Sequence, residues 1–203
     1  MSPPEPRLPA VLLAGGLARR MGGGDKCLVP LAGRPLLAHV IQAIRPQVDD
    51  LLLNANGDPA RFAAFGLPVR ADPLPGFPGP LAGVLAGMRW AAERGAGHVL
   101  SLPADTPFFP PDLAGQLAAA ISPDHPVACA ASGDREHPVI AVWSVALAPM
   151  LEEQLLAGKR RVGAFARLAG RRLVVWPAAP LDPFFNVNTP DDLALAVGRL
   201  DPT

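Results

Sequence analysis

The chain has 203 residues, half of them hydrophobic, and 18 lysines and arginines balance 18 aspartates and glutamates. A chain of this length buries roughly 70% of the surface that it exposes when unfolded, which is enough for one hydrophobic core. The balanced charge excludes a global field that would draw the protein onto nucleic acid or an anionic membrane, so any anion must be bound locally.

The ends of the chain and its cysteines indicate a cellular compartment. MSPPEPRLP has prolines and Glu5 where a signal peptide has a basic patch and an apolar run, and no later stretch approaches the ~18 apolar residues of a membrane span. Cys27 and Cys129 lack CxxC partners, which is typical of neither a disulfide framework nor a zinc site. We expect a cytoplasmic protein with residues 1–7 disordered and residues 8–200 forming one domain.

Short apolar runs alternate with longer segments of helical period, which predicts βα units around a mostly parallel sheet. The expected fold class is a three-layer α/β/α domain with Rossmann-like winding. The expected strands are, in chain order, Ala10–Leu13, Asp50–Asn54, Val69–Ala71, His98–Leu102, Val127–Ala131, Val139–Trp143 and Leu173–Trp176. The expected helices are Pro35–Arg45, Pro59–Phe65, Leu81–Arg94, Pro111–Ile121, Val145–Leu156, Val162–Leu168 and Asp191–Leu200, and several begin with a proline in the first turn.

Polar motifs follow four of the expected strands. They are LAGG at residues 13–16, NAN at residues 54–56, Asp72, and PADTP, which contains Asp105. Ligands of open α/β sheets bind beyond the carboxyl ends of the strands, where loops and helix N-termini converge. We therefore expect the four motifs to form one binding site.

The first of these motifs opens a glycine-rich loop. Residues 13–26 hold five glycines and three cationic side chains, Arg19, Arg20 and Lys26. Glycines permit positive φ and let backbone N–H groups approach an anion closely. A helix N-terminus contributes only ~0.3–1 kcal/mol to anion binding, whereas a cation about 4 Å from a phosphate oxygen gives roughly 4 kcal/mol of gross attraction. The loop therefore favours a polyphosphate, the alternative being a flexible surface loop.

Two familiar phosphate loops do not fit this segment. Lys26 lies between Asp25 and Cys27, so the preceding glycine and the magnesium-binding hydroxyl of a Walker A loop are both missing. The first strand is followed by GGLARR instead of GxGxxG, and the second ends in Asn54 where a dinucleotide site has an acidic residue. The segment is therefore not a P-loop, and its pattern argues against NAD binding.

The remaining polar residues each have a structural alternative. Asn54 and Asp72 fit nucleotide binding or the ending of strands. Asp105 fits Mg²⁺, which prefers one or two carboxylates with waters and substrate phosphates, or a surface turn. His137, before Pro138, is typical of a hydrogen-bonded structural histidine. The cations Lys159, Arg160, Arg161, Arg167, Arg171 and Arg172 make a solvated helix face or anchor an anion such as a pterin phosphate.

The pattern LAGGxAxRMGxxxK resembles the signature loop of the nucleotidyltransferase superfamily that includes MobA, the molybdenum cofactor guanylyltransferases. The matching positions are Leu13, Ala14, Gly15, Gly16, Arg20 and Lys26, and Asp25 also fits MobA-like members. The resemblance runs from about Pro9 to Leu200 and implies a fold of the nucleotide-diphospho-sugar transferase type. In that superfamily the loop wraps the triphosphate, and the lysine neutralises it as pyrophosphate leaves.

The resemblance also implies roles for residues beyond the loop. Asn54, Asp72, Gly79 and Asp105 would bind nucleotide, with Gly83 as a further close-approach position. Asp105, in the PxDTP motif, would hold Mg²⁺ and act in catalysis with Arg19, Arg20 and Lys26. The HP segment at His137 and the NVNTP motif, with Asn186 and Asn188, would bind the acceptor.

The implied reaction is transfer of GMP from Mg-GTP to molybdopterin or its molybdenum-loaded form. The implied protein partners are molybdoenzymes or cofactor-insertion proteins, contacted transiently. Two alternatives stay open: a cytidylyltransferase or sugar-phosphate nucleotidylyltransferase on the same scaffold, and a carrier that holds a nucleotide-cofactor without catalysis. Amides and backbone groups read either kind of base, so residue types leave the base preference open.

Overall fold

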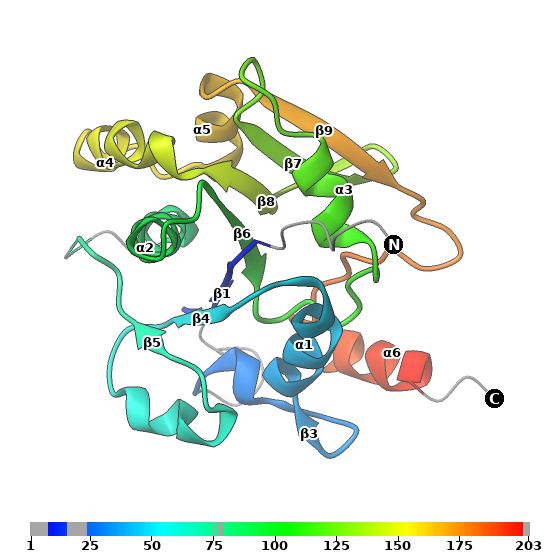
Figure 1. Cartoon of the computed structure of the whole chain (residues 1–203). Helices are drawn as coiled ribbons and strands as arrows, with labels where there is room; N and C mark the ends of the chain where they lie inside the picture. Colours follow the sequence, from blue (N-terminus) through cyan, green and yellow to red (C-terminus); the bar gives the residue numbers. More distant parts are fainter. Residues whose placement is uncertain (1–7, 16–23, 75, 77–78, 201–203) are drawn as a thin grey trace, which may run out of the picture.

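Seven strands form one mixed sheet in the computed structural model, which describes residues 8–15, 24–74, 76 and 79–200 (Figure 1). The strands are β1 (Ala10–Leu13), β4 (Leu51–Asn54), β5 (Val69–Arg70), β6 (His98–Pro103), β7 (Val127–Ser132), β8 (Arg135–Ser144) and β9 (Arg171–Trp176). Their spatial order is β5-β4-β1-β6-β8-β7-β9. Among the described strands of this seven-stranded sheet, only β8 is antiparallel to its neighbours, so the expected mostly parallel sheet is confirmed.

Helices cover both faces of the sheet. They are α1 (Leu36–Ile44), α2 (Pro80–Glu93), α3 (Leu113–Ala119), α4 (Ala148–Leu156), α5 (Val162–Leu168) and α6 (Pro190–Leu200). Buried side chains of α1 and α3 pack into one core cluster, and those of α2, α4 and α5 pack into a second cluster on the other face (Figure 1). A small hairpin of β2 (Pro30–Leu31) and β3 (Arg34–Pro35) packs with α6 at one end. The three-layer prediction is confirmed.

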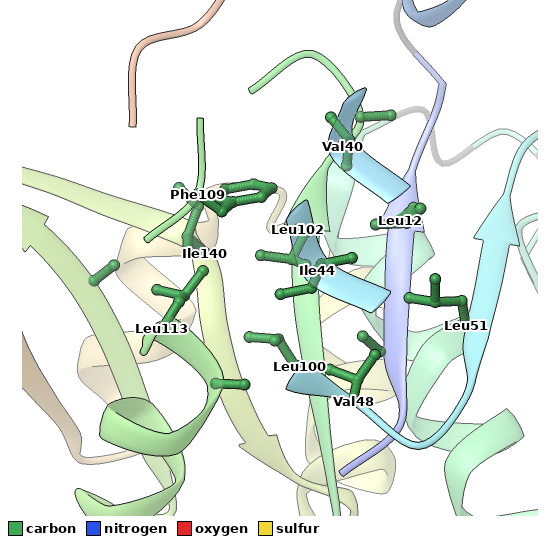
Figure 2. Close-up of a cluster of buried hydrophobic side chains, with 14 of the residues drawn as sticks. Leu12, Val40, Ile44, Val48, Leu51, Leu100, Leu102, Phe109, Leu113 and Ile140 are labelled. Carbon is green, nitrogen blue, oxygen red and sulfur yellow. The ribbon is translucent and has the colours of Figure 1, made fainter. Parts of the chain in front are cut away.

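The sheet is apolar on both faces because helices bury both. Along β1, Leu12 joins the cluster under α1 while Val11 joins the cluster under α2, as the twofold period of a strand requires. Figure 2 shows Leu12 with Leu51, Leu100 and Leu102 of the neighbouring strands, close to Ile44 of α1. A continuous apolar run such as AVLL is therefore the pattern of a strand buried between two helix layers.

Helix α2 lies unusually close to β1 because glycine faces the strand. A methyl group at Gly87 would lie 2.4 Å from Cγ1 of Val11. Gly87→Ala is therefore expected to lower the free energy of unfolding by about 1–3 kcal/mol, the usual cost of overpacking a core.

Urea unfolding measures this change, and Gly115 of α3 supplies the control. No heavy atom of the described residues lies within 4 Å of a methyl group at Gly115. Gly115→Ala should stabilise the protein by roughly 0.5–1 kcal/mol through helix propensity. Equal effects of the two variants would contradict the close packing of α2 on β1.

Several local predictions were wrong. Residues Pro59–Phe65 form a 3-10 helix, η3, not an α-helix. Helix α3 begins at Leu113, two residues after Pro111, and Pro35 ends the β2–β3 hairpin instead of beginning α1. These differences are local, because they move no element out of its layer.

Strand β8 begins at Arg135, four residues before the expected start at Val139. The extension places His137 and Pro138 inside the strand. The pairing between β7 and β8 shifts register there, since Cys129 pairs with Ala141 but the next residue, Ala130, pairs with His137. Proline has no N–H for the ladder, which is why it is tolerated in a strand at such an irregularity.

None of the helices in the described ranges combines the length and the apolar character needed to cross a bilayer.

Candidate active site

A cleft of about 500 Å³ lies at the carboxyl ends of β1, β4 and β6. All four motifs expected to converge contribute to its wall. Among its lining residues are Leu13, Gly15, Asn54, Asn56, Asp72, Gly79, Asp105, His137 and Asn186. The four motifs therefore meet in one cleft, as expected, because parallel strands present their carboxyl ends at one edge of the sheet.

Lys26 and Asp105 meet at this edge. Lys26 begins a short 3-10 turn, η1 (Lys26–Leu28), and its side chain is 10% exposed. Its ammonium group forms an ion pair with Asp105 Oδ2 and donates a second hydrogen bond to Asn188 Oδ1. Lys26 thus contacts both Asp105, after β6, and the NVNTP motif, although Lys26 and Asn188 lie 162 positions apart in the sequence.

The two carboxylate oxygens of Asp105 differ in their contacts. Its Oδ1 is buried and has no hydrogen-bond partner among the residues that the structure describes. The Asp105 carbonyl accepts a hydrogen bond from the Val187 N–H at 3.0 Å, which ties the NVNTP segment to the end of β6. A buried, unpartnered carboxylate oxygen is costly unless a cation or donor reaches it. The arrangement therefore fits a metal ion.

A full protein cage for a metal is not present in the described part of the chain, where no three His, Cys, Asp or Glu side chains gather. Mg²⁺ does not need one, because it keeps several waters and binds substrate phosphates through the same octahedral shell. Asp105 alone, facing a cleft beside a lysine, is the donor set that such an ion uses with a polyphosphate.

Asn54, Asn56 and Asp72 form a second hydrogen-bonded group that lines the cleft. The Asn54 amide donates to the Arg70 carbonyl and to Asp72 Oδ1, each at 3.1 Å. The Asn56 amide donates to Asp72 Oδ2 at 2.8 Å, and its oxygen accepts from the Asp72 N–H at 2.8 Å. Asn54 is buried and Asn56 is exposed. Both asparagines therefore hold Asp72, Asn54 through its amide nitrogen from a buried position and Asn56 through its nitrogen and its oxygen from an exposed one.

Two glycines shape the same wall for different reasons. Gly79, at the N-cap of α2, has φ of 142°, a conformation that other residues rarely adopt. At Gly83 a methyl group would lie 2.2 Å from Asn54 Oδ1, so glycine lets α2 approach the Asn54 side chain. The close approach expected at Gly83 is present, and the group that approaches Gly83 is the Asn54 side chain.

The acceptor-side residues lie on two neighbouring segments. Thr106, fully buried, donates from its hydroxyl to Asn186 Oδ1, and His137 shares a 2.6 Å hydrogen bond with the Ser132 hydroxyl. The His137 ring packs against Phe184 with 4.9 Å between ring centroids. Asn186 and His137 line the cleft. Asn188 instead accepts a hydrogen bond from the Lys26 ammonium group.

Burial lowers the pKa of His137 below its ordinary value, with Asp182 opposing the shift and Arg135 adding to it. In the unfolded chain His137 is protonated below about pH 6.5, whereas in the folded chain it stays neutral to a lower pH. The free energy of unfolding should therefore fall as the pH drops from about 6.5 toward the folded pKa.

His137→Gln removes this contribution. Urea unfolding of both proteins at pH 7.5 and pH 5.5 should give a smaller loss of stability for the variant than for the parent. An identical loss would contradict a neutral, buried His137 at neutral pH.

The basic residues between 159 and 172 do not act as one patch. Arg167 and Arg171 form ion pairs with Glu136 of β8 at 3.6 and 2.5 Å. These two cations are therefore neutralised within the sheet and its flanking helix. Lys159, Arg160 and Arg161 line a second concave surface with Phe165 and Leu168. The single solvated helix face considered from the sequence is therefore too simple for this segment.

Gly16, Arg19 and Arg20, named for the glycine-rich loop, lie outside the described residues, as do residues 1–7. Arg61 was missed by sequence reasoning. It binds Asp25 at 2.6 Å between Nε and Oδ2, directly beside Lys26. No spacing rule points to it, because the contact joins residues 36 positions apart through the tertiary fold.

Gly15 and the Asp105 carboxylate line a cleft of about 500 Å³, and Lys26 contacts Asp105, an arrangement that fits the class of nucleotidyltransferases. Residues 10–181 match the MobA-like NTP transferase domain. The chain belongs to this family and is a nucleotidyltransferase, which confirms the resemblance seen in the sequence.

Relatives match along nearly the whole chain. A protein of Rhodopseudomonas palustris (strain BisB5), named molybdenum cofactor guanylyltransferase, is 58% identical over 196 residues, or 95% of this chain and 93% of that protein. A protein of the same name from Bradyrhizobium sp. (strain ORS 278) is 53% identical over 93% of this chain and 91% of that protein.

Among solved structures, molybdopterin-guanine dinucleotide biosynthesis protein A from Archaeoglobus fulgidus has a TM-score of 0.73 at 24% identity, covering 97% of this chain and 100% of that one. This likeness establishes the fold.

Proposed function

We propose that the chain transfers GMP from Mg-GTP to molybdopterin or its molybdenum-loaded form, yielding the guanine dinucleotide cofactor and pyrophosphate. The observation that carries the proposal is the meeting of Lys26 and Asp105 at the mouth of the nucleotide cleft. The name shared by relatives up to 58% identical over nearly the full length supports this particular reaction.

The nucleotide is proposed to lie between the glycine-rich loop and the group of Asn54, Asn56 and Asp72. Gly15 faces open space, since no heavy atom of the described chain lies within 4 Å of a methyl group there. Backbone at such a position lets a phosphate approach closely. The base is proposed to bind near Asn56 and Asp72, whose amide and carboxylate are the polar groups on that wall.

The chemistry needs positioning and charge neutralisation more than a covalent protein group. An oxygen of the acceptor's terminal phosphate attacks the α-phosphorus of GTP, and the bond between the α-phosphorus and the bridging oxygen breaks. Lys26 gains triphosphate oxygens as acceptors and stabilises the negative charge of the leaving pyrophosphate. Asn188 and Asp105 hold the Lys26 ammonium at that place beforehand.

Asp105 is proposed as the Mg²⁺ ligand because its buried Oδ1 lacks a partner among the described residues. When bound, Mg²⁺ supplies positive charge to the triphosphate. Asn186 and His137 are proposed to line the acceptor half of the cleft, with Thr106 fixing the orientation of the Asn186 amide.

A transfer assay tests the proposal. The purified chain is incubated with Mg²⁺, molybdopterin and GTP, CTP or UTP labelled at the α-phosphate, and pyrophosphate release is followed together with label in the pterin product. GTP is expected to give both products. Pyrophosphate with CTP alone would assign a cytidylyltransferase, and nucleotide binding without pyrophosphate would assign a carrier; either result overturns the proposal.

A further inference from the structure

Arg61 lies on η3 beside the cleft, and each nitrogen of its guanidinium has an acceptor. Nε donates to Asp25 Oδ2 at 2.6 Å, Nη2 donates to the Asn56 carbonyl at 2.5 Å, and Nη1 donates to the Asp58 carbonyl. The guanidinium carbon lies 4.5 Å from the centre of the Phe62 ring. The side chain is 28% exposed. Three bonds and a ring contact therefore fix its position.

The partners of Arg61 belong to the two loops that face the nucleotide. Asp25 directly precedes Lys26, at the end of the glycine-rich loop after β1. Asn56 belongs to the loop after β4, and its side chain exchanges two hydrogen bonds with Asp72. Arg61 thus links the phosphate lysine to the Asn56–Asp72 pair across two separate segments of the chain.

The charge of Asp25 makes this link necessary. A carboxylate next to Lys26 repels a polyphosphate and competes for the lysine ammonium. The Arg61 pair neutralises that carboxylate and holds it away, in a part-buried contact that water screens less than an exposed one. An arginine suits this place because its planar fork reaches several acceptors at once, whereas a lysine offers a single compact charge.

We infer that Arg61 is a positioning residue for the triphosphate. It fixes Asp25, and through it Lys26, in the geometry that receives the phosphates. The inference rests on the proposed function only in placing a triphosphate at Lys26. It does not depend on which base or acceptor the enzyme prefers.

Arg61→Ala and Arg61→Lys test the inference, with Arg94→Ala as the matched control. Arg94 has the same kind of environment, since its Nε pairs with Asp50 Oδ2 at 3.2 Å and its guanidinium carbon lies 4.3 Å from the Trp90 ring centre. Asp50 precedes β4, at the edge of the sheet opposite the cleft. Arg94→Ala should leave the KM for GTP unchanged.

Arg61→Ala is expected to raise the KM for GTP and to lower kcat/KM for GTP by roughly 10- to 100-fold, the scale of a misplaced catalytic group. Arg61→Lys should recover little of the loss. The KM for molybdopterin should stay unchanged, because the acceptor half of the cleft does not touch Arg61. A general loss of folded protein would lower kcat without changing the KM for GTP, and that pattern would overturn the inference.

Asp25→Asn adds a coupling test. If Arg61 acts through Asp25, Arg61→Ala in the Asp25→Asn protein should cause a much smaller further loss than in the parent. Fully additive losses would overturn the inference.

Inorganic triphosphate with Mg²⁺ separates this inference from the guanylyltransferase assignment. We expect it to raise the Tm of the parent and of Arg94→Ala, and to raise that of Arg61→Ala much less. Equal shifts in all three, or no shift in the parent, would overturn the role of Arg61. A parent that binds inorganic triphosphate but transfers no GMP would overturn the proposed function and leave the Arg61 result standing.

Discussion

Asp105→Asn is expected to lower kcat for nucleotidyl transfer by about 1,000-fold, the upper range for losing one group that stabilises transition-state charge. Asparagine keeps the size of the side chain and an oxygen for Lys26, so the fold should persist. The substitution removes the negative charge that a Mg²⁺ ion requires at the otherwise unpartnered Oδ1. Steady-state kinetics across a Mg²⁺ titration should show a higher Mg²⁺ requirement as well as a lower maximal rate.

Asp50→Asn is the control for this prediction. Asp50 is also an aspartate paired with a cation, Arg94, but at the amino end of β4 and away from the cleft. The rate and the Mg²⁺ requirement of Asp50→Asn should match those of the parent. Turnover close to normal in Asp105→Asn would remove Asp105 from the proposed metal site.

Lys26→Ala is expected to lower kcat by about 100-fold, because one cation facing the leaving pyrophosphate is lost. The Lys26 side chain is only 10% exposed and is held by Asp105 and Asn188, so its charge is placed before substrate arrives. Single-turnover measurements with saturating Mg-GTP report this loss without a contribution from product release.

The two variants should differ in their response to Mg²⁺. Removing the ammonium takes a competing cation from Asp105, so the Mg²⁺ concentration for half-maximal rate should not rise in Lys26→Ala. Asn188→Ala should show a weaker version of the same defect, because it removes one of the two groups that hold the lysine. A rise in Mg²⁺ requirement for Lys26→Ala equal to that of Asp105→Asn would contradict separate roles for the two side chains.

Much of the architecture could be predicted from local patterns. The expected strand Ala10–Leu13 and the expected helix Val162–Leu168 match β1 and α5 residue for residue. The polar motifs after β1, β4, β5 and β6 met in one cleft, as the edge rule for parallel strands requires. Both successes rest on short-range information, namely an apolar run and the polar residues that end it.

Other features depended on distant parts of the chain. Strand β8 begins early at Arg135 because its first three residues pair with Ala130–Ser132 of β7, and the irregularity at Pro138 is a property of the pair. The Asn54 amide donates to Asp72 Oδ1 and to the Arg70 carbonyl, and its expected role in nucleotide binding stays a prediction. Residue type and spacing do not predict which groups accept the hydrogen bonds of a side-chain amide.

The sequence by itself determined the class of fold, the edge at which the site lies and the family, since hydrophobic period and motif order carry that information. The tertiary structure decided which side chains meet. It paired Lys26 with Asn188 and Arg61 with Asp25, and it left one oxygen of Asp105 without a partner among the described residues. The physical reason is that such contacts join segments brought together only by the order of strands in the sheet, and local propensity contains no record of that order.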